Sequence, residues 1–198
     1  MLNTVIETQM QQLASKSLDS SNKFGYDKST KILYCYLLWA KKTSIYDLVK
    51  EVTKELSFEE KFDLKTIEFG EEYTEDDCVS AVREIVDNNN GINEWMYSSP
   101  SSLNKLVTKI INLKDGESFC DFGSGDGKLL LNVFDVAHKN KFNCKYTGYE
   151  INAKQVLVSK CLMCMLNVDT TIFLEVNKSP YIPFKESHSS IEYFNPNG

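Results

Sequence analysis

The sequence predicts an α/β fold in which a parallel β-sheet follows an all-helical N-terminal segment. Apolar residues recur at helical spacings through roughly the first 90 residues, and short strand-like runs then alternate with helical stretches. A loop with glycines at positions 123, 125 and 127 follows the first of these runs. We therefore expect a helical domain over residues 1–92 and an α/β domain over residues 93–198.

Helical periodicity defines the N-terminal segment. Apolar spacings over residues 30–55 predict one or two helices with a break at residues 41–44, and residues 57–64 also have a helical pattern. A further helix is expected over residues 74–91, where Thr74 is a suitable N-cap and acidic residues occupy the first turn. The Asn-Gly pair at its end is a helix stop, so the junction between the two domains is expected there.

The second half of the chain alternates strands with helices. A helix that begins with serine and proline is expected over residues 98–116. Strand-like runs follow at residues 117–122, 144–150, 170–176 and 190–195. Helical stretches separate the first three of these runs, at residues 128–139 and 152–167. Strands joined by helices of this length form parallel sheets through right-handed crossovers, so a Rossmann-like sheet is expected.

Composition narrows the class of protein. With 198 residues, 42% hydrophobic and 25% charged, the chain falls in the range of soluble globular proteins. It has no apolar run of membrane-spanning length and no secretory signal pattern, so a cytoplasmic protein without a membrane partner is expected. The six cysteines are too scattered for a disulfide framework. Cys161 and Cys164 form one Cys-x-x-Cys pair on a predicted helix, but the chain has only two histidines, so no metal site is expected.

The charge of the chain is unevenly distributed. Residues 51–80 contain eleven acidic and three basic residues, whereas the whole chain has a net charge of −6. Arg83 is the single arginine, so the chain has little capacity for the bidentate contacts by which guanidinium groups read guanine or grip phosphate. If the protein acts on nucleic acid, we expect another component to provide most of the contacts.

The loop Asp121-Phe122-Gly123-Ser124-Gly125-Asp126-Gly127 carries most of the functional signal. It lies where a strand passes to a helix, which is where open parallel sheets bind ligands. A phosphate-binding P-loop would need glycine at Phe122 and serine or threonine at Leu129. A dinucleotide fingerprint would need glycine at Lys128. Both patterns are therefore disfavoured, and a glycine turn without a ligand remains the structural alternative.

The loop matches D-x-G-x-G-x-G, and in this respect the chain resembles the class I methyltransferases. The resemblance implies S-adenosyl-L-methionine as cofactor. It also implies that the glycine backbone lies against the methionine and ribose portions and that Asp121 holds the amino end. Glu150, at the end of the next predicted strand, would accept hydrogen bonds from the ribose hydroxyls, a role that suits an acceptor-only carboxylate. The implied cofactor-binding residues of this region are Asp121, Phe122, Gly123, Ser124, Gly125, Gly127, Glu150, Ile151 and Asn152, the last two flanking the adenine.

The segment upstream of the loop narrows the resemblance. Tyr97-Ser98-Ser99-Pro100, then a helix and an acidic glycine turn, is similar to the N6-adenine DNA methylases, especially the modification subunit of type I restriction-modification systems. That family places a Tyr/Phe-Thr-Pro segment over the cofactor after a helical N-terminal domain. The resemblance therefore implies cofactor contacts by Tyr97, Ser99 and Pro100. It also implies DNA as a partner through a specificity subunit, and self-association is a further expectation.

The chain departs from this family at the catalytic motif. The family carries Asn/Asp/Ser-Pro-Pro-Tyr/Phe after its fourth strand, whereas this chain offers only Asn195 and Pro196, which we take as the candidate catalytic residues. Three or four strands fit where a full class I sheet has seven, so a truncated chain is expected. Two alternatives therefore stay open: a class I methyltransferase acting on protein, RNA or a small molecule, and a non-catalytic module for cofactor binding or partner docking.

Overall fold

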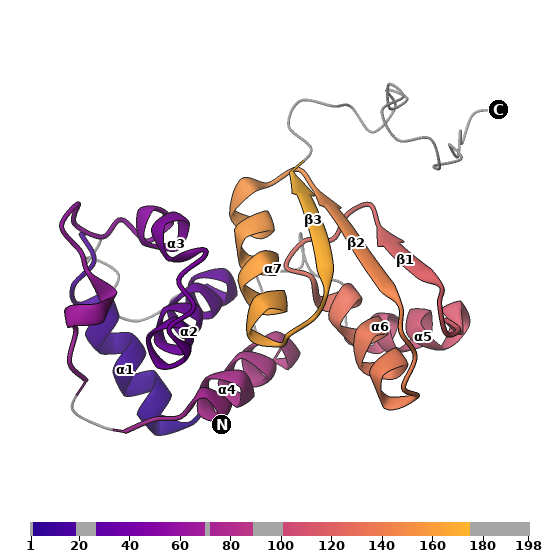
Figure 1. Ribbon diagram of the computed structural model, residues 1–198, viewed down its shortest axis with the longest axis horizontal. Helices are drawn as coiled ribbons and strands as arrows, with labels where there is room; N and C mark the ends of the chain where they lie inside the picture. Colours follow the sequence, from indigo (N-terminus) through magenta and orange to yellow (C-terminus); the bar gives the residue numbers. More distant parts are fainter. Residues whose placement is uncertain (1, 19–26, 70–71, 89–100, 175–198) are drawn as a thin grey trace.

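The computed structural model describes residues 2–18, 27–69, 72–88 and 101–174, which form a helical part beside an α/β part (Figure 1). The helical part contains α1 (Thr4–Ala14), α2 (Lys28–Thr43), α3 (Val49–Glu55), a short 3₁₀ turn (Leu64–Thr66) and α4 (Glu75–Asp87). The α/β part contains α5 (Ser101–Ile111), β1 (Ser118–Asp121), α6 (Lys128–Lys139), β2 (Lys145–Glu150), α7 (Ala153–Met165) and β3 (Thr170–Leu174).

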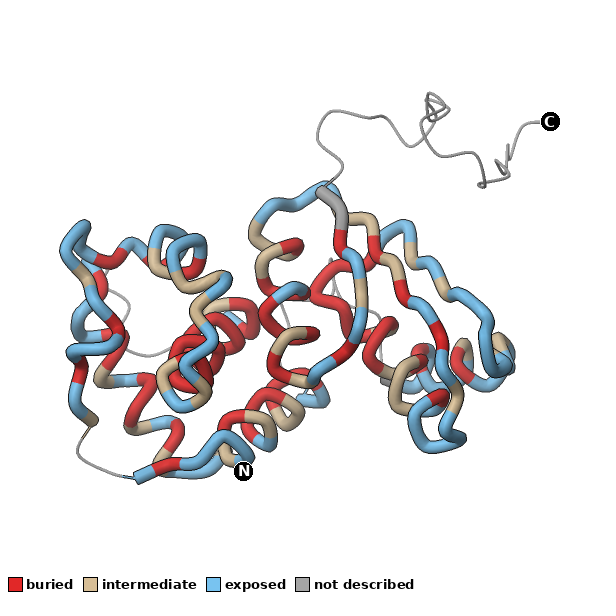
Figure 2. The backbone as a smooth tube through the Cα atoms, viewed as in Figure 1, coloured by how far each residue is buried: buried red, intermediate tan, exposed pale blue. Residues whose placement is uncertain are grey.

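Helix α2 is the centre of the helical part. Every residue from Ile32 to Ala40 is buried, as expected for a helix that is apolar on all sides (Figure 2). It packs against α1, α3 and α4 and, on another side, against α7 of the α/β part. The buried apolar residues of both parts therefore form one continuous core.

The helix expected over residues 57–64 is not formed, so this prediction was wrong. Helix α3 ends at Glu55, and Ser57 then has a positive φ of 55°, which takes the backbone out of helical geometry. Phe58 forms an antiparallel bridge with Ser17, and its ring lies 3.9 Å from that of Phe62. This segment buries apolar side chains although its backbone forms turns. The spacing of apolar residues alone does not distinguish such a segment from a helix.

The start of α4 confirms the predicted N-cap and allows a direct test. The Thr74 hydroxyl accepts from the Asp77 N–H, and the Asp77 carboxylate accepts from the Thr74 N–H, which is a complete capping box. A Thr74→Ala variant is expected to lose about 1 kcal/mol of unfolding free energy in urea denaturation. Thr8→Ala, inside α1, is the control and should lose less; equal losses in both variants would contradict the capping role.

The sheet has the predicted parallel topology. The strands lie in the order β1-β2-β3, and both pairs are parallel, with α6 and α7 as the crossover helices. The predicted strands 117–122 and 144–150 agree with the observed elements within one residue at each end, and the third begins at residue 170 as predicted, its last two residues lying outside the described part of the chain. The run expected at residues 190–195 lies outside the described residues. The prediction of an α/β fold preceded by helices is therefore confirmed.

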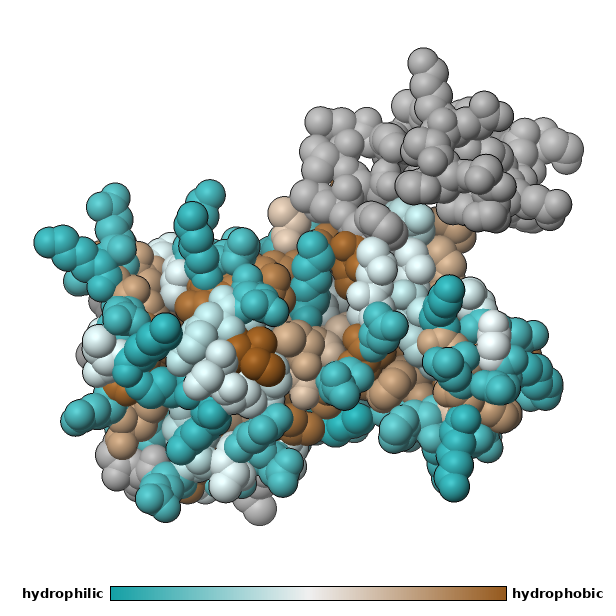
Figure 3. Space-filling view, in the orientation of Figure 1, coloured by the Kyte–Doolittle hydropathy of each residue, from teal (hydrophilic) through white to brown (hydrophobic). Residues whose placement is uncertain are grey.

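The described helices include none that is long and apolar enough to cross a membrane. On the face shown in Figure 3, hydrophilic side chains are spread over both parts, and apolar residues form only small groups between them.

Candidate cofactor site

The glycine loop joins β1 to α6 at the carboxyl ends of the strands. The Ser124 N–H donates to the Tyr149 carbonyl at 3.0 Å, which ties the loop to the end of β2. The Gly127 N–H then donates to the Ser124 carbonyl at 2.8 Å and closes the turn that begins α6. Gly125 and Gly127 have positive φ angles of 52° and 85°, which glycine adopts without strain.

The glycines of this region serve different purposes. A Cβ on Gly127 would lie 2.5 Å from Ser159 Oγ, and one on Gly148 would lie 2.8 Å from Ile172 Cδ1, so both are needed for close packing inside the protein. Gly123 differs, because a Cβ there would have no atom within 4 Å and its φ is ordinary. No described residue therefore requires glycine at this position, and none of them fills the space beside its backbone.

The side chain of Glu150, the last residue of β2, contacts the glycine loop. Its Oε2 accepts from the Gly125 N–H at 2.9 Å, and its Oε1 accepts from the N–H groups of Ile151 and Asn152, both at 2.8 Å. The fold thus brings together the loop after β1 and the acid at the end of β2, which lie 25 residues apart in sequence. A carboxylate offers about four acceptor positions, so one remains beyond these three bonds.

Asp121 provides a second carboxylate at the same place. Its Oδ1 accepts from the Gly123 N–H at 3.1 Å. Burial raises the pKa of Asp121, the negative charge of Glu150 raises it further, and the Gly123 hydrogen bond opposes both effects. Two neighbouring carboxylates, one of them partly desolvated, favour a positively charged ligand, because such a ligand relieves their mutual repulsion.

Apolar side chains lie beside the acids. Phe122 is 64% exposed and its ring stacks on that of Tyr149, with centroids 5.5 Å apart and an interplanar angle of 12°. Ile151 is 67% exposed. The side chain of Asn152 caps α7, since its oxygen accepts from the N–H groups of Lys154 and Gln155. Asn152 thus has a structural role whether or not it also flanks an adenine.

Some predicted residues cannot be placed relative to this site. Tyr97, Ser99, Pro100, Asn195 and Pro196 lie outside the described residues. Gly148, which the sequence analysis missed, allows the loop to pack closely on β2, because a Cβ there would lie 2.9 Å from Ser124. A single glycine within a strand-like run is the signal that could have identified it, because it often marks a close backbone approach.

Arg83 has a structural partner. Its guanidinium forms a two-pronged ion pair with Asp135, at 2.9 and 3.2 Å, which joins α4 to α6. Among the described residues no group of three or more His, Cys, Asp or Glu side chains could hold a metal ion.

The glycine loop after the first strand and the acid at the end of the second are the features of the cofactor-binding half of a class I methyltransferase. The chain belongs to the N-6 DNA Methylase family, whose sequence model matches residues 70–188. No curated protein matches the chain at a significant level.

Two solved structures are similar in part. A protein from Listeria monocytogenes, described as a class I S-adenosylmethionine-dependent methyltransferase, is 14% identical; the match covers 87% of this chain and 53% of that one, with a TM-score of 0.48. The type I restriction-modification system methyltransferase subunit from Streptococcus thermophilus is 13% identical; the match covers 93% of this chain and 55% of that one, with a TM-score of 0.40. The chain therefore spans about half the length of both.

The family match confirms the resemblance to N6-adenine DNA methylases. A methylase family agrees with the prediction of a methyltransferase that uses S-adenosylmethionine. The boundary between the two domains and the roles of individual site residues stay predictions.

Proposed function

We propose that this chain is the cofactor-binding part of an N6-adenine DNA methylase of a restriction-modification system. It would act in the cytoplasm on DNA, with a specificity subunit providing most of the DNA contacts. When bound, S-adenosylmethionine supplies an electrophilic methyl group for the adenine amine. The residues of this chain bind and orient that cofactor: Gly123 admits it to the backbone, and Glu150 and Asp121 hold its ribose and amino end.

The observation that carries the proposal is the hydrogen bond from the Gly125 N–H to Glu150, which brings the acid at the end of β2 to the glycine loop. Two residues before Gly125, the described residues leave space beside Gly123. The residues present suit this cofactor in three respects. The acids suit a ligand that bears a sulfonium and an ammonium group, the remaining acceptor position of Glu150 suits a hydroxyl donor, and exposed Phe122 and Ile151 offer apolar surface to a base. The fit supports the proposal at the level of ligand chemistry.

Two experiments test the proposal in order. Calorimetric titration of the folded chain with S-adenosylmethionine should give saturable binding, and no heat at millimolar cofactor would exclude a competent site. Transfer of a labelled methyl group should then favour DNA that lacks adenine methylation over RNA and lysate protein. Binding without any product from this chain would instead support the non-catalytic alternative.

The need for a specificity subunit is supported by the charge distribution. Arg83 is already ion-paired with Asp135, and residues 51–80 are strongly acidic. Since phosphate contacts by basic residues supply most non-specific DNA affinity, the isolated chain should bind DNA weakly. Tight, sequence-specific binding by the isolated chain in a gel-shift assay would contradict this part of the proposal.

An Asp121→Asn variant should gain stability at pH 7 and lose cofactor affinity. The folded state raises the pKa of Asp121, so the stability this group contributes is complete below its unfolded pKa and is lost as the pH rises through its folded pKa. Asparagine keeps an acceptor for the Gly123 N–H but removes the charge. Thermal unfolding at pH 7 should therefore give a higher Tm. Titration should show about tenfold weaker cofactor binding, because one charge-assisted hydrogen bond to the cofactor is lost.

Asp115→Asn is the matched control for this variant. Asp115 also accepts a backbone N–H, from Asn143 at 2.7 Å, but it precedes β1 and so lies at the other end of that strand. Its replacement should leave cofactor affinity unchanged. A lower Tm of Asp121→Asn at pH 7 would show that the Asp121 charge stabilises the fold, contrary to the expectation.

A further inference from the structure

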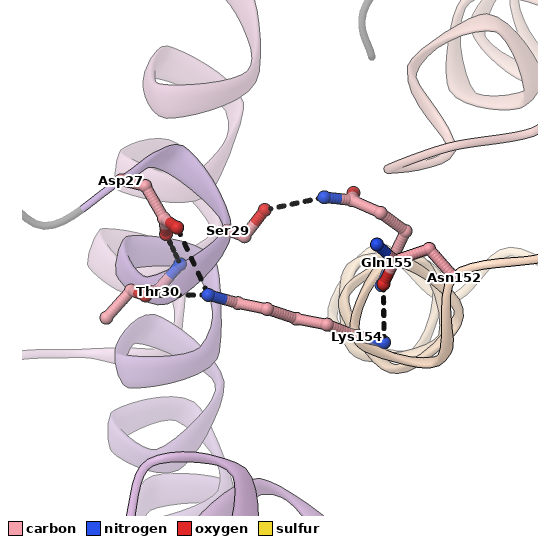
Figure 4. Close-up of polar contacts among 6 residues, drawn as sticks. All are labelled: Asp27, Ser29, Thr30, Asn152, Lys154 and Gln155. Carbon is pink, nitrogen blue, oxygen red and sulfur yellow. Dashed lines mark hydrogen bonds and ion pairs between the residues drawn. The ribbon is translucent and has the colours of Figure 1, made fainter. Parts of the chain in front are cut away.

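The first turn of α2 connects the helical part to the cofactor site. Lys154 Nζ donates to Asp27 Oδ2 at 3.1 Å, and Gln155 Nε2 donates to Ser29 Oγ at 3.0 Å (Figure 4). Lys154 and Gln155 lie in the first turn of α7, directly after the segment in which Glu150 ends β2. One side of the α2 start is therefore bound to the segment that follows the candidate ribose-binding acid.

Lys28 makes the corresponding contact with the glycine loop. Its Nζ lies 2.6 Å from Asp126 Oδ2, and the two side chains are only 9% and 8% exposed. Asp126 stands between Gly125 and Gly127, and its Oδ1 accepts from the Lys128 N–H at 3.1 Å in the first turn of α6. A single carboxylate thus links α2, the loop and α6.

Because the ion pair is buried, the loss of one of its partners should be costly for the structure around it. Removing one partner of a buried pair leaves an uncompensated charge, whereas removing both charges is often nearly neutral for stability. Lys128 is buried as well, and the charges of Lys28 and Asp126 act on its pKa in opposite directions. If Lys28 were lost, Asp126 would keep Lys128 as a neighbouring cation and would move toward it or toward water, and either change would disturb the backbone between Gly125 and Gly127. The exposed pair of Lys154 and Asp27 does not impose this constraint, because surface pairs contribute little.

We propose that Lys28 is a positioning residue for the cofactor: through its buried ion pair with Asp126 it holds the glycine loop in the conformation that binds S-adenosylmethionine. The inference rests on the proposed function for the identity of the ligand. It assigns to the helical part a role in cofactor binding, since Lys28 lies on α2 and its ion pair is with Asp126 of the glycine loop. Forces that move α2 would then change cofactor affinity.

The test uses Lys28→Met and the double variant Lys28→Met/Asp126→Asn. The double variant removes both charges but keeps an acceptor for the Lys128 N–H. The buried Lys128 ammonium loses the repulsion of Lys28 together with the attraction of Asp126, so the Tm of this variant should be near that of the unaltered protein. Lys154→Met is the control, because it breaks a contact of the same junction without touching the loop. Cofactor affinity is measured by titration well below each Tm, and amide hydrogen exchange of residues 123–128 is measured without cofactor.

Both Lys28 variants are expected to bind S-adenosylmethionine about tenfold more weakly, as when the competent loop conformation falls to one-tenth of the population. Their loop amides should exchange faster, while amides of β2 and α7 and all properties of Lys154→Met stay unchanged. Unaltered affinity and unaltered loop exchange in the double variant would overturn the inference. If the unaltered protein binds no cofactor, the proposed function fails, and loop exchange alone still decides whether Lys28 holds the loop.

Discussion

A Gly123→Val variant is expected to keep its fold and lose its cofactor. A Cβ at this position would meet no atom of the described residues within 4 Å, and the backbone has no positive φ, so the unfolding free energy should change by less than about 0.5 kcal/mol. The branched side chain would occupy the space in which the cofactor approaches the backbone. We expect titration with S-adenosylmethionine to show affinity at least about a hundredfold lower, because a ligand pushed off the loop loses several contacts at once.

Gly127→Ala gives the opposite result and is the matched comparison. Its new Cβ would lie 2.5 Å from Ser159 Oγ and 2.8 Å from Met163 Cε, at a φ of 85°. The variant should therefore lose about 2–4 kcal/mol of unfolding free energy from overpacking and backbone strain. If Gly123→Val lost as much stability as Gly127→Ala while cofactor binding by its folded fraction persisted, the open space at Gly123 would not be a ligand site.

This contrast shows how far the sequence could define the site. The position of the loop at a strand end and the resemblance to class I methyltransferases predicted the loop and Glu150 as parts of one site. The topology of a parallel sheet brings such strand ends together. The sequence could not distinguish Gly123 from Gly127. That difference depends on Ser159 and Met163 of α7, and the sequence does not specify which side chains of that helix approach the loop.

Helix α5 shows a second limit. Its periodicity predicted a helix, and the apolar stripe Leu103, Leu106 and Ile110 would ordinarily be assigned to the core. These side chains are instead 45%, 54% and 71% exposed, while Asn104 and Thr108 are buried. Among the described residues only three strands are present, and none covers the stripe. The direction that an amphipathic helix faces thus depends on elements that its own sequence does not contain.

The junction at α2 was also beyond the sequence analysis. Lys28 and Asp126 are 98 residues apart, and a lone lysine at a helix start ordinarily indicates a solvated residue. Only the folded structure, in which both side chains are buried against each other, gives this pair its significance. The helical part could therefore be predicted as a fold but not as a support for the cofactor loop.

Glu150→Gln is expected to reduce affinity for S-adenosylmethionine about a hundredfold, since two hydrogen bonds to a charged acceptor are lost or weakened. Glutamine can still accept from Ile151 and Asn152 through its single oxygen. Its NH₂ group would then oppose the Gly125 N–H, so the loop loses one of its ties to β2 and the ribose loses a charged acceptor. Titration calorimetry measures the loss, and thermal unfolding shows whether the fold persists.

Two comparisons separate a direct contact with the ribose from a general effect of the substitution. Glu117→Gln is the matched control, because Glu117 also accepts a backbone N–H, from Lys114 at 2.6 Å, but lies before β1 at the end away from the glycine loop. It should bind cofactor normally. A 2′-deoxy analogue of the cofactor should bind the unaltered protein more weakly than the cofactor does. The Glu150→Gln variant should bind the analogue and the cofactor almost equally well, because the two changes remove the same interaction. Fully additive losses would mean that Glu150 acts only through the loop and makes no bond to the ribose.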